Sequence, residues 1–168
     1  MSWVDWVTGY ICNHTESSGE CVYGICLRGA IVSAADGTIW GQHGFALQEY
    51  ELPLEDDNGK TITGVVNEFN NLKNAWENGG KTKNYGGLRF CQEKFTLARF
   101  DEDSETMYLS GKDSGACVAK SGQCFVIGIH YKTGQMLATS LGKERNYSPG
   151  NANAAVENCR DKLVDAGY

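Results

Sequence analysis

The chain opens with SWVDWVTGYI (residues 2–11), and this stretch contains the start signal and the spacing of a helix. Ser2 followed three residues later by Asp5 has the form of a capping box, which predicts that the helix begins here. Two stripes then follow at helical spacing: Val4, Val7 and Ile11, and Trp3, Trp6 and Tyr10. A short terminal helix cannot bury so wide an arc against one core. We therefore expect one stripe to cover something other than the core.

The other end of the chain also predicts a helix. Ser148 suits the N-cap position, Pro149 suits the first helical position, and Gly167 suits a stop. The predicted inner stripe of this helix consists of Ala152, Ala155, Val156, Cys159 and Leu163.

Two elements are predicted near the middle of the chain. Residues 30–33 and 38–40 flank Asp36-Gly37, a pair that accepts the positive φ angles of a tight turn, so they predict a β-hairpin. Residues 61–71 contain four apolar positions at spacings of three and four, which predicts a short amphipathic helix. These positions are Ile62, Val65, Val66 and Phe69.

From Leu88 onward, alternating polar and apolar residues separated by glycine-bearing loops predict an antiparallel meander. Its predicted strands are residues 89–91, 94–97, 106–109, 116–119 and 124–131. Residues 135–139 could add a strand, or residues 132–147 could form an ordered loop. The expected fold class is α+β, one domain over residues 1–168, with an antiparallel sheet and both terminal helices on one face.

Length and composition fit one globular domain. The 168 residues include 21 glycines and 2 prolines, which favours many tight turns over stiff linkers. A net charge of -6 without a basic run argues against nucleic acid or a membrane surface as the main partner. The acidic runs at residues 55–57 and 101–103 are expected to be solvated loops.

The first five residues lack the basic start and apolar run of a signal peptide, so we expect a cytoplasmic protein. The seven cysteines are odd in number and form no CxxC pair, which argues against a disulfide framework or a zinc site. We expect neither a metal nor another cofactor.

An enzyme would need a nucleophile beside a base. Cys124 and His130 supply these residue types, but six residues of strand separate them by about 20 Å. A site assembled from several strands is the alternative, although no nucleophile motif supports it. We therefore expect a protein that is not an enzyme.

Several of these stretches, in this order, resemble the profilin family of small actin-monomer- and polyproline-binding proteins. The resemblance covers residues 2–7, 36–40, 62–69, 87–94, 115–122, 148–153 and 165–168. Two stretches, residues 51–61 and 132–147, look longer than the family's usual connections. Cys91-Gln92 stands where the family commonly has Gly-Gly.

The resemblance implies a profilin-like fold with the short helix on the opposite face of the sheet, and a groove for proline-rich peptides between the terminal helices. A polyproline II peptide is ordered before binding and can lay its rings flat against indole. Lys162 stands where the family often has an aromatic residue or histidine. The implied groove residues are Trp3, Trp6, Trp40, Lys162, Leu163 and Tyr168.

The resemblance also implies a face that binds monomeric actin and assists nucleotide exchange on it. Lys94 and Thr96 share one side of their strand, whereas Arg99 has the opposite parity and fits only if the strand ends or bulges. Residues 132–147 could add contact with actin or block it. The implied actin-contacting residues are Tyr85, Lys94, Thr96, Arg99, Lys112, Gly150 and Asn153.

The implied partners are monomeric actin and proline-rich proteins such as formin-type assembly factors, in the cytoplasm and cytoskeleton. Phosphoinositide binding is also known in the family, but the acidic balance here argues against it. The alternative function is an adaptor that binds proline-rich peptides with weak or no actin binding.

Overall fold

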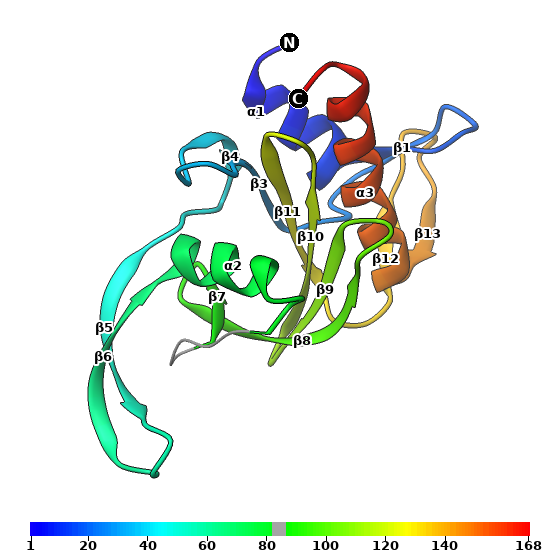
Figure 1. The fold of residues 1–168 in the computed structure, drawn as a ribbon. Helices are drawn as coiled ribbons and strands as arrows, with labels where there is room; N and C mark the ends of the chain where they lie inside the picture. Colours follow the sequence, from blue (N-terminus) through cyan, green and yellow to red (C-terminus); the bar gives the residue numbers. More distant parts are fainter. Residues whose placement is uncertain (82–86) are drawn as a thin grey trace.

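A computed structural model describes residues 1–81 and 87–168. Within these residues, seven strands form one curved antiparallel sheet in the order β4-β3-β11-β10-β9-β8-β7 (Figure 1). The predicted hairpin forms its first edge and the predicted meander forms the rest. The strands are β3 (Arg28–Ser33), β4 (Ile39–His43), β7 (Leu88–Phe90), β8 (Glu93–Asp101), β9 (Thr106–Gly111), β10 (Ser114–Lys120) and β11 (Cys124–Tyr131).

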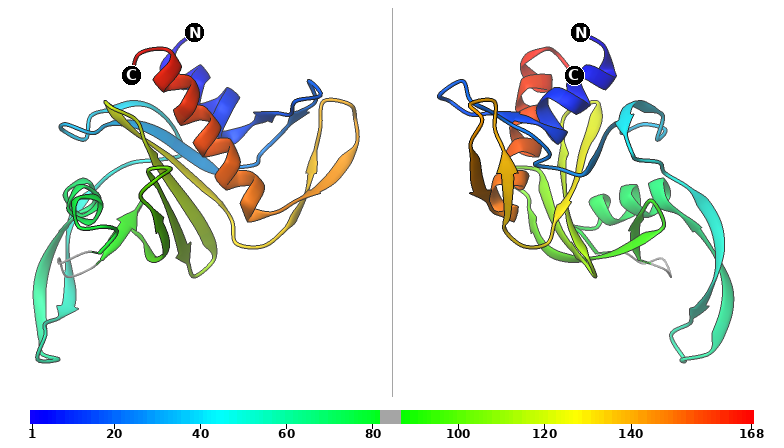
Figure 2. Two further views of the ribbon diagram at one scale, coloured as in Figure 1. Left: turned by 45° about the vertical axis from the view of Figure 1, so that its right-hand side comes forward. Right: turned by 180° about the vertical axis from the view of Figure 1, so that it is seen from behind.

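Helices cover both faces of the sheet (Figure 2). Ile31 and Cys117 point into a core beneath the two terminal helical segments, whereas Val32 and Val118 point into a second core beneath α2. This arrangement confirms the expected α+β class, with both chain ends on one face and a short helix on the other. The helices are α1 (Trp3–Trp6), which continues as the π-helix η1 (Val7–Cys12), α2 (Glu68–Glu77) and α3 (Pro149–Asp165).

The predicted caps hold both terminal helices in place. The Asp5 N–H donates to Ser2 Oγ at 3.1 Å and the Ser2 N–H donates to Asp5 Oδ2 at 2.9 Å, which completes the capping box. Ser148 and Asn151 form the equivalent arrangement at the start of α3. The inner stripe predicted for α3 is fully or almost fully buried. Local side-chain chemistry therefore fixes both starts.

The helix predicted for residues 61–71 is wrong over most of its length. Residues Thr61–Asn67 form the strand β6, which pairs with β5 (Glu49–Glu55) through register pairs such as Leu54↔Ile62. The β-branched side chains in this stretch favour a strand, and pairing with β5 decides between the two structures. The helix α2 begins only after Asn67, whose side chain accepts a hydrogen bond from the Asn70 N–H at 2.9 Å.

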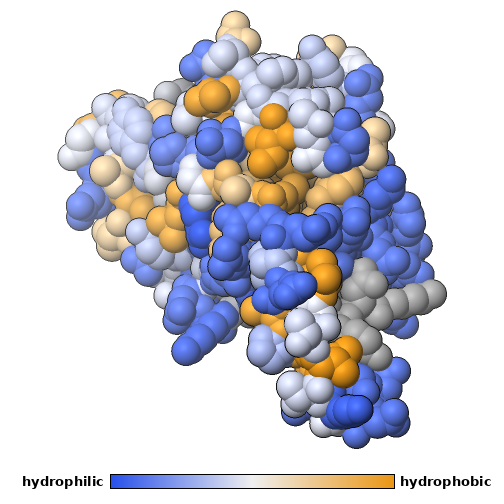
Figure 3. Space-filling view, turned by 90° about the vertical axis from the view of Figure 1, so that its left-hand side faces the viewer, coloured by the Kyte–Doolittle hydropathy of each residue, from blue (hydrophilic) through white to orange (hydrophobic). Residues whose placement is uncertain are grey.

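The two stretches expected to be long connections both belong to β-hairpins. The β5–β6 hairpin extends away from the body, and the face on that side mixes hydrophilic and hydrophobic side chains (Figures 1 and 3). Residues 132–147 contain β12 (Gln135–Ala138) and β13 (Glu144–Tyr147), so the strand alternative was correct for most of residues 135–139. The short pair β1 (His14–Thr15) and β2 (Cys21–Val22) joins this second hairpin through a bridge between Val22 and Thr139.

The turn between β3 and β4 differs from the expected tight turn. Gly37 has a φ of +79°, but Asp36 is not among the residues with positive φ. Asp36 Oδ1 instead accepts a hydrogen bond from the Thr38 N–H at 2.9 Å. The connection is thus a loop of residues 34–38 that is closed by a side chain.

Among the described residues, no helix has both the length and the apolar character required to cross a membrane.

Candidate functional site

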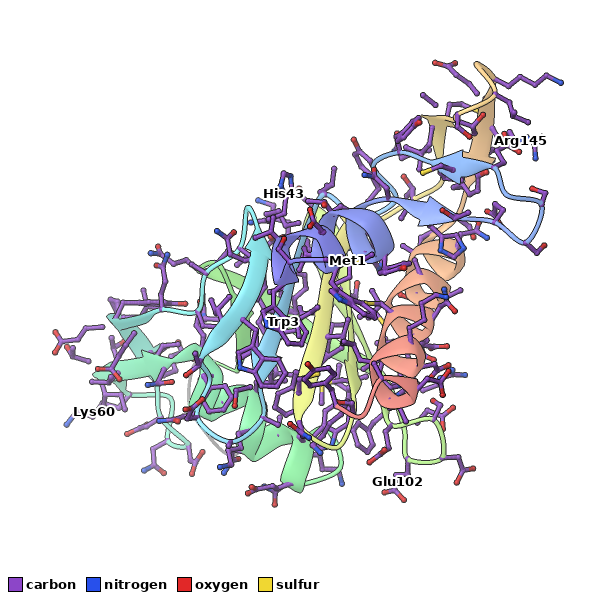
Figure 4. All side chains as sticks on the ribbon, turned by 90° about the horizontal axis from the view of Figure 1, so that it is seen from above. Met1, Trp3, His43, Lys60, Glu102 and Arg145 are labelled. Atoms are coloured by element: carbon purple, nitrogen blue, oxygen red, sulfur yellow. The ribbon has the colours of Figure 1, made fainter. Side chains whose placement is uncertain are left out.

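Three aromatic rings from distant parts of the chain meet beside the two termini. The ring centroid of Trp3 lies 5.0 Å from that of Trp40 and 5.0 Å from that of Tyr168, and Trp40 and Tyr168 are 6.0 Å apart. None of the three is fully buried, and Tyr168 keeps 40% of its surface exposed. Figure 4 looks onto this end of the molecule, with Trp3 labelled beside the first helix.

Close backbone packing places these rings. A side chain at Gly41 on β4 would lie within 2.6 Å of the backbone of Trp3, so α1 rests directly on this strand. The last residue is also fixed, because the Tyr168 N–H donates to the Leu163 carbonyl at 2.9 Å. Gln123 Nε2 donates to the Gly167 carbonyl at 3.2 Å. The chain terminus therefore forms part of the surface.

The aromatic surface continues along the first helix. The rings of Trp6 and Tyr10 lie 5.0 Å apart, and Lys162 Nζ lies 5.4 Å from the Tyr10 ring centroid. The site prediction omitted Tyr10, although its spacing from Trp3 and Trp6 placed it in the same stripe. We use the name aromatic groove for Trp3, Trp6, Tyr10, Trp40, Lys162 and Tyr168.

Leu163 is a correction to the predicted groove. Its side chain is fully buried in the core beneath the terminal helices, so it offers no surface to a ligand. Leu163 instead supports the groove indirectly. It packs in the core beneath the terminal helices, and its carbonyl accepts the hydrogen bond from the Tyr168 N–H. Val4, which was placed in a stripe with Val7 and Ile11, is 50% exposed, whereas the other two are fully buried.

The groove has the chemistry needed to hold an extended apolar peptide. Half-exposed indole and phenol rings offer flat faces to apolar rings, and their N–H and O–H groups can donate hydrogen bonds to peptide carbonyls. A polyproline II segment has no internal hydrogen bonds, so its carbonyls are available to such donors.

A second candidate surface lies on β8 and β9, and a bulge creates it. The register shifts between Leu97 and Arg99, so that Thr96 pairs with Ser110 and Arg99 pairs with Tyr108. Directly opposed residues share a face, and Ser110 and Tyr108 are two residues apart on β9. Thr96 and Arg99 therefore point to the same side. From the sequence alone this requires a strand end or a bulge, and the structure contains the bulge.

Contacts join this face to α3. The Arg99 guanidinium lies 4.5 Å from the Tyr108 ring centroid, and the Tyr108 hydroxyl donates to a carboxylate oxygen of Glu157 on α3. Burial, together with this hydrogen bond, raises the pKa of Tyr108. Asn153 lies above the adjacent strand, with Cys117 Sγ 3.9 Å from its carbonyl oxygen.

The remaining residues predicted to contact actin lie as follows. Lys94 is exposed on β8, on the same side as Thr96, and Gly150 is exposed in the first turn of α3. Lys112 is exposed in the turn between β9 and β10, where Lys132 Nζ donates to the Gly111 carbonyl at 2.7 Å. Tyr85 lies outside the described residues. We use the name basic face for Lys94, Thr96, Arg99, Lys112, Gly150 and Asn153.

The buried thiols are poorly suited to nucleophilic chemistry. All seven cysteines are free, and burial raises the pKa of Cys12 to about 11 and that of Cys159 to about 12. A thiol with so high a pKa holds little thiolate at neutral pH. Burial also lowers the pKa of His130. No cluster of metal-ligating side chains occurs among the residues that the structure describes.

Comparison with known proteins agrees with this architecture. The family model named Profilin matches residues 1–168. A profilin of Tetrahymena pyriformis is 33% identical over 141 residues, which cover 83% of this chain and 88% of that protein. Profilin Ib of Acanthamoeba castellanii is 20% identical with a TM-score of 0.63, and Schizosaccharomyces pombe profilin is 19% identical with a TM-score of 0.62. Each comparison covers 99% of this chain and 100% of the solved one.

The fold and the two surfaces define a small α+β domain whose first and last helices share one face of an antiparallel sheet, with a cluster of partly exposed aromatic rings beside them. The chain belongs to the profilin family.

Proposed function

We propose that this chain binds proline-rich peptides through the aromatic groove and monomeric actin through the basic face, and thereby regulates actin polymerisation and nucleotide exchange on actin. The observation that carries the proposal is the contact of Trp3 with both Trp40 and Tyr168. Three rings from the first helix, a strand and the chain terminus are brought to one surface without being fully buried. Proline-rich assembly factors of the formin type are the expected peptide partners.

Several features support a ligand-binding role for these rings rather than a purely structural one. Trp3, Trp6, Tyr10 and Trp40 pack against the first core, but each is only partly buried and therefore keeps exposed surface for a ligand. Aromatic residues exposed side by side are typical of grooves that bind polyproline II segments. Hydrogen bonds also fix the start of α1 and the Tyr168 backbone, so fewer groove residues must lose conformational freedom when a peptide binds.

The basic face supports the actin part of the proposal. The chain has a net charge of -6, yet Lys94, Arg99 and Lys112 are all exposed on or beside one side of β8–β9. Exposed cations suit association with an acidic protein surface, although Arg99 also pairs with Asp101 at 3.9 Å. Asn153 and Gly150 extend this face onto the first turns of α3.

The position of the β12–β13 hairpin bears on the choice between actin binding and the adaptor alternative. It ends at Tyr147, a buried residue directly before the α3 cap, so its root is fixed next to Gly150. Arg145 on the hairpin pairs with the buried carboxylate of Glu20 at 2.9 Å, which ties the hairpin to the β1–β2 segment. From this position the hairpin either contacts actin or obstructs it.

Two binding measurements and one assembly assay test the proposal. The purified chain should be retained on polyproline resin, and it should co-elute with monomeric actin in gel filtration and delay spontaneous assembly of pyrene-labelled actin. Retention on the resin without any effect on actin would favour the adaptor alternative. Loss of both activities would contradict the proposal.

A deletion identifies the role of the hairpin. Residues 133–146 are replaced by a short Gly-Ser linker, and Glu20→Gln in the same variant removes the buried charge that Arg145 would have paired. Stronger actin binding by this variant than by Glu20→Gln alone would show that the hairpin obstructs actin. Weaker binding would show that it contributes contacts.

A further inference from the structure

A polar hollow continues the aromatic groove beyond Tyr10. Tyr10 lines both surfaces, and the other residues around the hollow come from the start of the β1–β2 segment and from α3. The residues that line it are Tyr10, His14, Thr15, Glu16, Ser17, Asn158 and Lys162. A peptide that leaves the aromatic rings along the first helix therefore enters a surface with a different chemistry.

The hollow contains hydrogen-bond donors that no group in the described part of the chain uses. Among the described residues, the side chains of Lys162, Asn158 and Ser17 form no hydrogen bond or ion pair. The neighbouring Asp161 is instead engaged by Arg160, at 2.6 Å. Lys162 Nζ lies over the Tyr10 ring, 5.4 Å from its centroid. A hollow lined by an ammonium group and two neutral donors suits a carboxylate.

The hollow also contains one negative charge, from Glu16, which is half-buried. Within the described residues, Glu16 and Lys162 form no ion pair with each other. Lys162 Nζ lies over the ring of Tyr10, which belongs to the aromatic groove. A ligand leaving the groove therefore meets the cation at that point.

The length of the groove sets the position of the charged ligand residue. Trp3 and Tyr10 are seven positions apart along α1 and the π-helix η1, which corresponds to about 10 Å at most at the α-helical rise of 1.5 Å per residue. A polyproline II segment advances about 3.1 Å per residue, so about three residues cover this distance. A residue three to four positions beyond the proline on Trp3 would lie beside Lys162.

We propose that Lys162 and the hollow select proline-rich ligands that carry an aspartate or glutamate three to four residues beyond the proline that packs on Trp3. This inference rests on the proposed peptide-binding function and adds the class of ligand that the groove prefers. Lys162 acts as a specificity-determining residue through a solvent-exposed charge pair with the ligand, so its effect is modest and sensitive to salt.

The test uses the full chain and three synthetic peptides, each a run of eight prolines flanked at one end by Asp-Asp, Ser-Ser or Lys-Lys, with both ends tested. Affinities are measured by tryptophan fluorescence at low and high salt. The Asp-flanked peptide should bind about threefold more tightly than the Ser-flanked one, as expected for an exposed pair. Lys162→Gln should abolish this difference, and high salt should reduce it.

The matched control is Lys143→Gln, which removes the same charge from an exposed position in the β12–β13 turn and should retain the preference. Equal binding of the three peptides, or a preference for the Lys-flanked peptide that is lost in Glu16→Gln, would overturn the inference.

A separate measurement with a proline decamer distinguishes failure of this inference from failure of the proposed function. If the decamer binds and the flanks have no effect, only the inference fails; if the decamer does not bind, the proposed function fails as well.

Discussion

The Trp3 ring packs edge-on against the Tyr168 ring, with 5.0 Å between their centroids and an interplanar angle of 76°. This contact joins the first helical turn of the chain to its last residue. Since neither ring is fully buried, the contact leaves an apolar surface that α1 and Tyr168 share.

Changing Tyr168 separates the role of its ring from that of its hydroxyl. We expect Tyr168→Ala to weaken binding of a proline decamer about tenfold, because a packed aromatic ring is lost. Tyr168→Phe keeps the ring and should cost about 1 kcal/mol or less, the worth of one neutral hydrogen bond. Isothermal titration calorimetry measures both variants. Equal losses in the two would assign the effect to the hydroxyl and contradict the ring-packing account.

The β8 bulge places Arg99 on the basic face, which we propose binds actin. We expect Arg99→Glu to weaken binding of monomeric actin about tenfold, because it reverses an exposed charge opposite Tyr108. Gel filtration at several actin concentrations measures the change. Lys60→Glu, an equal charge reversal in the turn of the β5–β6 hairpin, is the control and should leave actin binding unchanged. Equal effects of the two variants would point to net charge rather than to this face.

The turn between β7 and β8 stores strain. Cys91 and Gln92 have φ values of 52° and 65°, in the left-handed region that favours glycine. The buried Glu68 holds this turn, because its Oε2 accepts the Gln92 N–H at 2.8 Å. We expect Cys91→Gly to raise the free energy of unfolding by about 0.5–1 kcal/mol. Cys91→Ala keeps the strain and is the control in urea titrations; a Gly variant no more stable than it would refute the prediction.

Buried thiols should make the fold sensitive to alkaline pH. Burial raises the pKa of Cys12 from 9.0 to about 11, so between these values the folded chain keeps a proton that the unfolded chain has lost. Stability from this group is therefore complete below pH 9.0 and falls as the pH rises toward about 11. Urea unfolding under reducing conditions measures the slope. Cys12→Ala should show a shallower decline, and an identical decline would contradict the assignment to this thiol.

Much of the fold could be predicted because its signals are local. The Ser2 and Ser148 caps, the stripe from Ala152 to Leu163 and the alternation after Leu88 each depend on neighbours within a few residues, and the structure contains all of them. The aromatic groove was partly predictable for the same reason, since Trp3, Trp6 and Tyr10 share helical spacing.

The errors arose where distant contacts decide the structure. Residues 61–67 have spacings compatible with a helix, and only pairing with β5, a charged segment interrupted by Pro53, makes them a strand. Leu163 has a place in the inner stripe of α3 and also lies close in sequence to Tyr168, but packing against the sheet assigns it to the core. The sequence could not decide whether a bulge brings the Arg99 side chain to the same side as Thr96, because strand register depends on the partner strand.

The most direct test of the account is a tryptophan-fluorescence titration of Trp3→Ala with a proline decamer. Removing one large aromatic side chain from the groove deletes a contribution of about 2 kcal/mol before costs, so we expect affinity to fall at least tenfold with the fold intact. The control is Trp76→Phe, which changes a tryptophan packed against Phe100 and Phe125 on the opposite face of the sheet and should bind as the unaltered chain does. Unchanged affinity in Trp3→Ala would contradict the central claim that the two chain ends together form the peptide-binding groove.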